Sequence, residues 1–73
     1  MLQKQFIDGF SQVHFVGGLV RINLYQLEPV PNAEPKEEEV AQLIMTPQAF
    51  VESFNAMQQL AEKLAEAGIL QRS

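Results

Sequence analysis

The fold is decided by the stretch Leu43-Ile44-Met45-Thr46-Pro47, where an alternating pattern of side chains gives way to a helical one. Thr46 has a hydroxyl that can cap a helix, and Pro47 suits the first helical position, where no backbone N–H is needed. Apolar residues then recur at helical spacing, namely Phe50, Phe54, Met57, Ala61 and Leu64. The sequence therefore predicts a strand that ends at Met45 and a helix from Pro47 to about Ala67.

The end of this helix is marked by Gly68, because a glycine after the last helical residue can take the left-handed conformation that closes the final turn. Glu62 and Glu66 fall opposite the apolar stripe. We expect Phe50, Phe54 and Met57 to be core residues packed on a sheet, with a cofactor or partner groove as the less favoured interpretation.

Upstream, Gly17-Gly18 interrupts a strand-like pattern that runs from Phe10 to Leu27. If these glycines form a two-residue hairpin turn, Val16 faces Leu19 and Gln12 faces Asn23. One side of the hairpin then has Val13, Phe15, Val20, Ile22 and Leu24, and the other has Gln12, His14, Arg21 and Asn23. A one-residue slip would mix the two sets, so the pattern predicts this register and an apolar core side.

The segment 28–38 contains three prolines and four acids and is predicted to be a solvated loop. Both a binding role and a tolerated surface insertion remain open for it. Residues 39–45 resume alternation with apolar groups on both sides, which suggests that both faces of this strand are covered. Asp8-Gly9 could turn a short first strand into the hairpin, although a frayed terminus or a helical turn fits residues 1–9 equally well.

The resulting fold class is α+β, a single domain over residues 1–73. We expect a three-stranded, possibly four-stranded, antiparallel meander with one long C-terminal helix packed on one face. A helix of about 21 residues spans about 31 Å and is longer than a typical strand, so it must overhang its sheet. A homodimer, or a larger closed oligomer, would bury the excess through helix–helix or sheet–sheet contacts.

Two surfaces are predicted on the outer side of the sheet. The residues expected at an oligomer interface are apolar, namely Leu19, Tyr25, Leu27, Val40 and Ile44. The residues of a possible ligand or partner patch are polar, namely Gln12, His14, Arg21 and Asn23. For this polar patch, an ordinary solvent-facing side of a sheet is the favoured interpretation.

Composition disfavours most chemistry. There is no Cys, which removes thiolate zinc sites and thiol nucleophiles and fits a reducing cytoplasm. Ser11 and His14 are three positions apart, an odd offset along a strand, and should face opposite sides, so they make a poor catalytic pair. We therefore expect no catalytic residue, no cofactor and no metal site.

A net charge of −4 disfavours nucleic acid as a partner, and no stretch is long and apolar enough for a membrane span.

A resemblance is carried by Val40-Ala41-Gln42-Leu43-Ile44-Met45-Thr46-Pro47 running into a helix after a strand pair and an acidic linker. Over roughly residues 15–64 the chain resembles a small bacterial family known as a domain of unknown function. That family tends to have a basic residue early in the helix, where this chain has Gln48, Ala49 and Phe50. The resemblance implies a fold but no functional residue.

The leading hypothesis is a non-catalytic structural or protein–protein interaction module that associates with itself, and possibly with another protein. One alternative is a weak nucleic-acid-binding regulator, although the basic residues are scattered along the chain. The other is a small enzyme whose site, built around His14 and Arg21, is shared between protomers.

Overall fold

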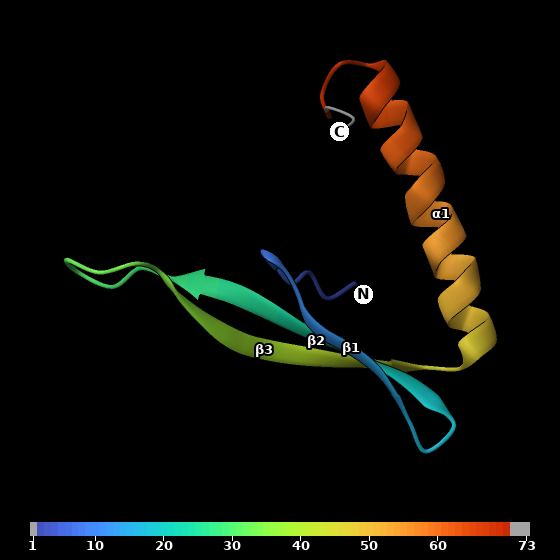
Figure 1. Cartoon of the computed structure of the whole chain (residues 1–73), viewed down its shortest axis with the longest axis horizontal. Coiled ribbons are helices and arrows are strands. Elements are labelled where there is room, and N and C mark those ends of the chain that lie inside the picture. Colours follow the sequence, from blue (N-terminus) through green and yellow to red (C-terminus); the bar gives the residue numbers. More distant parts are fainter. Residues whose placement is uncertain (1, 71–73) are drawn as a thin grey trace.

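The computed structural model describes residues 2–70 and confirms the predicted fold class, a three-stranded antiparallel meander followed by one long helix (Figure 1). The strands are β1 (Gly9–Val16), β2 (Leu19–Glu28) and β3 (Lys36–Met45), with β2 in the centre. Helix α1 covers Pro47–Glu66. Within the described part of the chain there is no fourth strand.

The turn between β1 and β2 is formed by Gly17-Gly18, as predicted. Both glycines have positive φ, 63° and 78°, as the central residues of a type I′ turn require. The predicted register is confirmed from Val16 opposite Leu19 to Gln12 opposite Asn23. One face of β2 consequently carries the buried core of the described chain, which is Val20, Ile22 and Leu24.

Residues before β1 do not form the predicted hairpin, so the interpretation of Asp8-Gly9 as a type I′ turn is wrong. Neither residue has positive φ. Asp8 instead ties the chain to β2: its backbone N–H donates to the Tyr25 carbonyl at 2.8 Å, and its carboxylate accepts from the Leu27 N–H at 2.7 Å. Ile7 then packs against the buried cluster.

Beyond the start of β1, strands β2 and β3 continue together as a two-stranded extension. Pairing shifts by one residue at Ser11 and again at Val40, and it continues to Glu28 opposite Lys36. The connecting loop is therefore residues 29–35, and the predicted loop over residues 28–38 is too long at both ends. Charge does not distinguish loop from strand here, because Glu37 and Glu38 keep their side chains in water while their backbones pair with β2. We call residues 28–39 the acidic arm.

Both predicted ends of α1 are confirmed. The Thr46 hydroxyl accepts from the Ala49 N–H at 3.1 Å, and Pro47 takes the first helical position. At the other end Gly68 has φ 78°, and the Ile69 N–H donates to the Leu64 carbonyl at 2.9 Å. This six-to-one bond is the signature of a Schellman closure, which satisfies a carbonyl that the helix leaves free.

The helix touches the sheet only near its first turns and then rises away from it (Figure 1). Phe50 packs against the buried cluster, but Phe54 and Met57 are 55% and 53% exposed. On the facing sheet, Val13 and Phe15 are 51% and 64% exposed, so the expectation that Phe54 and Met57 are core residues is wrong for the single chain. A single residue separates β3 from α1, so the helix starts at the edge of the sheet and leaves β1 uncovered.

Within the single chain, strand β3 is not covered on both faces, and coverage by a second chain stays a prediction. Its apolar residues Val40, Leu43 and Ile44 are all exposed within the single chain. Strand β3 is an edge strand, and the helix that follows it turns toward β2 near Met45 rather than back along β3. Apolar side chains are thus left uncovered on both sides of this strand.

Candidate interaction surface

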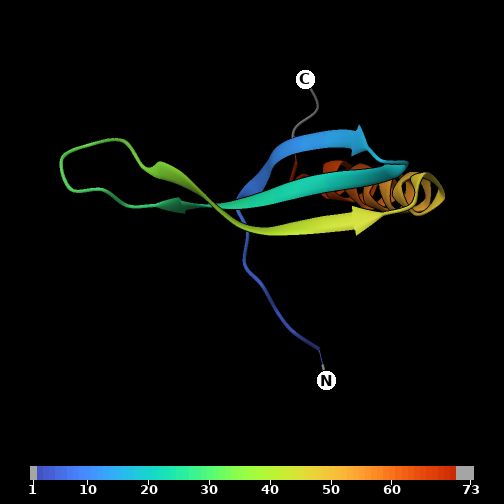
Figure 2. The same ribbon diagram turned by 90° about the horizontal axis from the view of Figure 1, so that it is seen from below.

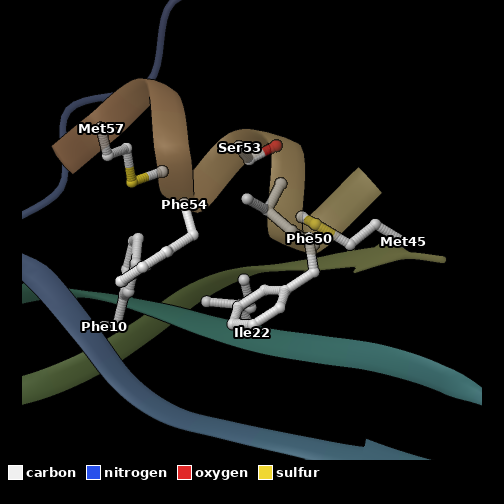
Figure 3. A pocket seen from close by; sticks show the side chains of 8 residues that line it. Phe10, Ile22, Met45, Phe50, Ser53, Phe54 and Met57 are labelled. Carbon is white, nitrogen blue, oxygen red and sulfur yellow. The ribbon is translucent and has the colours of Figure 1, made fainter. Parts of the chain in front are cut away.

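An apolar groove lies between α1 and the sheet (Figure 3). Phe10 and Ile22 point from the strands toward the helix, and Phe50 and Phe54 point back toward the strands. The groove contains a cavity of about 150 Å³, and its lining comprises Phe10, Ile22, Leu43, Met45, Phe50, Ser53, Phe54 and Met57. Ser53 is the single polar side chain among these, so the groove suits an apolar occupant.

The apolar surface continues past the groove on both walls. On the helix, Leu60 is one turn beyond Met57 and is 57% exposed. On the sheet, Val13 and Phe15 share the face of Ile22 and Val20, to which they are paired. We define the concave apolar surface by its exposed or half-exposed members, which are Phe10, Val13, Phe15, Leu43, Phe50, Phe54, Met57 and Leu60.

The size of the uncovered surface can be judged against a compact monomer. The chain exposes 6335 Å², whereas a folded monomer of 8.2 kDa is expected to expose about 4,500 Å². The Cα radius of gyration is 15.1 Å, against about 11 Å for a compact domain of this length. The single chain therefore exposes about 1,800 Å² more than a compact protein of its mass.

The opposite face of the sheet carries the predicted polar patch, and its centre is a ladder of amides. Gln42 Nε2 donates to Asn23 Oδ1 at 2.8 Å, and Asn23 Nδ2 donates to Gln12 Oε1 at 3.5 Å. His14 and Arg21 face each other in the adjacent pair of the ladder. These side-chain amides hydrogen-bond to one another across the three strands, and cross-strand pairs of this kind stabilise the sheet and its register.

Sequence reasoning missed Gln42 as a member of this patch. The signal that could have found it is the alternation over residues 40–44, which puts Gln42 on the face opposite Leu43. Without the pairing of β2 with β3, nothing places Gln42 beside Asn23. The structure therefore extends the predicted patch from two strands to three.

The residues predicted at an oligomer interface lie on this same polar-centred face, around the amide ladder. Leu27, Val40 and Ile44 are exposed, and Leu19 and Tyr25 are half-buried. No partner contact tests them, so their role stays a prediction. The concave apolar surface is not among these predictions, because the spacing of its side chains on α1 and β1 is typical of a core that the helix closes.

The candidate catalytic residues are held apart by other bonds. Ser11 Oγ lies 3.4 Å from the Asn23 carbonyl and 3.2 Å from Glu39 Oε2, while Asp8 bonds to the backbone of β2. Within residues 2–70 neither of them hydrogen-bonds to His14, and three or more side chains of metal-binding type do not gather anywhere. None of the helices described is long and apolar enough to cross a membrane.

The charge of the molecule is concentrated on the acidic arm. This arm carries five of the nine acidic residues and one of the five basic ones, which equals the whole formal net charge of −4. Glu28 and Glu38 are diagonal neighbours across β2 and β3, and a hydrogen bond between their side chains together with like-charge repulsion raises the pKa of Glu28. Figure 2 shows the arm projecting from the end of the sheet opposite to α1.

No family model matches the sequence, and no curated protein or solved structure matches it significantly. The resemblance carried by residues 40–47 therefore stays a prediction.

Proposed function

We propose that this protein is a non-catalytic structural or interaction module that works as a homodimer. The observation that carries the proposal is the excess of about 1,800 Å² of exposed surface over a compact chain of the same mass. The excess includes the acidic arm, but it also includes the concave apolar surface, and exposed apolar patches of this kind mark interaction sites. A second chain is the simplest way to cover them.

The small buried core supports the same conclusion. Among residues 2–70, three are buried, all on β2, which is a small core for a domain of this length. Domains of this size gain only about 3–5 kcal/mol from one core, and the chain has no Cys with which to make a disulfide. Association would supply the burial that the single chain lacks.

A role without chemistry is supported by the nature of the groove. Its lining has Ser53 as the one polar group and no titratable side chain. Enzyme pockets usually combine an apolar wall with convergent polar groups of shifted pKa. The groove therefore suits packing of apolar side chains better than binding and turnover of a substrate.

The proposal is tested by light scattering on the purified protein eluting from a size-exclusion column. The expected molar mass at micromolar concentration is twice 8.2 kDa. A monodisperse species of 8.2 kDa that keeps its helix by circular dichroism would overturn the proposal. A variant with Phe54→Asp should shift the mass toward the monomer, whereas Gln59→Asp, on the opposite side of α1, should leave it unchanged.

A further inference from the structure

The middle of α1, at Met57 and Leu60, is left more than half exposed by the described chain. The helix has 20 residues and is about 30 Å long, and of its side chains Phe50 packs against the buried cluster while Phe54 and Met57 line the open groove. Met57 and Leu60 are each more than half exposed and lie on the same stripe as Phe50. An amphipathic helix gains its stability in a protein mainly from burial of such a stripe.

The sheet has a matching uncovered strip. Strand β1 is an edge strand, and Val13 and Phe15 present apolar side chains on the face from which α1 rises. Together with Phe10, which lines the groove, they form an apolar row that is 45–64% exposed. The molecule thus has one uncovered helix stripe and one uncovered sheet strip, on the two walls of a single groove.

We infer that the occupant of this groove is α1 of a second copy of the chain, exchanged reciprocally about a two-fold axis. In this arrangement Met57 and Leu60 of one protomer lie on Val13 and Phe15 of its partner, and the two helices pack side by side through their stripes. The inference rests on the proposed function and adds to it the surface and the contacts.

The excess of about 1,800 Å² per chain includes the projecting acidic arm and the exposed residues 2–6, so it is an upper bound on what the groove interface buries. Twice this bound, about 3,600 Å², lies within the range of about 2,000–5,000 Å² for permanent dimers. A single short apolar peptide would cover the groove but leave the distal helix stripe exposed. A second copy covers both, because in an isologous interface each protomer supplies what the other lacks.

Charge placement also favours a second copy. The proposed contact contains no ionisable side chain, and the acidic arm, which carries the net charge, lies at the end of the sheet away from α1 (Figure 2). Two copies can therefore approach through the concave apolar surface without bringing their acidic arms together. A charged partner would find nothing in the groove to pair with.

The test uses introduced cysteines, since the chain has none of its own. Protein with Phe15→Cys, carrying an affinity tag, is unfolded and refolded together with untagged Leu60→Cys protein and then mildly oxidised. Any tagged–untagged disulfide must join two different chains. The matched control is Gln59→Cys, the neighbouring position on the polar side of α1, and Val13→Cys serves as a second sheet position.

We expect about tenfold more mixed disulfide for Leu60→Cys than for Gln59→Cys, because a disulfide needs Cα atoms within about 7 Å. A dimer by light scattering with equal cross-linking of both positions would overturn the exchanged arrangement and leave the proposed function standing. Efficient Leu60–Leu60 cross-linking without any mixed product would do the same. A monomer throughout would overturn both.

Discussion

Replacing Phe54 with Ala should separate the two protomers while leaving the helix formed. Phe54 is 55% exposed, so about 110 Å² of a side chain of about 200 Å² is left for a partner to cover. Alanine would keep about a third of that area, and the loss of about 75 Å² corresponds to about 2 kcal/mol per copy at 25 cal/mol/Å².

In a two-fold dimer both copies carry the substitution, so the loss occurs twice. The dimer should therefore weaken by about 4 kcal/mol, which raises the dissociation constant about a thousandfold. Alanine has the highest helix propensity, so the substitution itself should not unwind α1. Sedimentation equilibrium over a dilution series measures the constant directly.

The control for this experiment is Gln59→Ala, which has the same kind of truncation on the polar side of α1. Its dissociation constant should stay within about threefold of the parent value, as expected for a surface change away from an interface. Equal effects of the two substitutions, or no effect of Phe54→Ala, would refute the assignment of the helix stripe to the interface.

Three further predictions concern the fold. Gly17→Ala should destabilise the protein by about 1–2 kcal/mol in urea unfolding, because φ is 63° and nothing crowds the position, whereas Gly17→Asn should cost clearly less; equal costs would contradict the backbone explanation. Thr46→Ala should cost about 1 kcal/mol through loss of the helix cap, and Thr46→Ser should restore most of it; an unaffected Thr46→Ala variant would show that the cap contributes nothing. The raised pKa of Glu28 means that the folded arm binds this proton more tightly than the unfolded chain, so pairing in the arm should strengthen as pH falls below the ordinary carboxyl range and weaken as pH rises through the raised pKa. Amide exchange in the arm should follow this trend, and Glu38→Gln should lower the pKa of Glu28; a pKa unchanged in that variant would contradict the pairing.

Local features of the fold could be predicted because short-range chemistry determines them. Gly17-Gly18 fixed the hairpin register through its turn type, and Thr46-Pro47 with Gly68 fixed both ends of the helix. These features depend on backbone conformation and neighbouring hydrogen bonds, which are encoded within a few residues.

The placement of the helix on the sheet could not be predicted in the same way. Periodicity identifies which side chains of α1 avoid water, such as Phe54 and Met57, but not whether their own sheet or another chain covers them. For the same reason, the structure of one chain does not test the predicted interface residues Leu19, Tyr25 and Ile44. The predicted start of β3 is too late, because the glutamate side chains of a two-stranded ribbon stay hydrated. A charged composition therefore does not distinguish such a ribbon from a loop.

The dependence of thermal unfolding on protein concentration tests the central claim most directly, because a chain that needs a second copy must melt at a temperature set by association. Over about a hundredfold range of concentration, linkage contributes about 2.7 kcal/mol, and the melting temperature should rise by about 5–10 °C. A melting temperature independent of concentration, for a species of 8.2 kDa, would contradict the account.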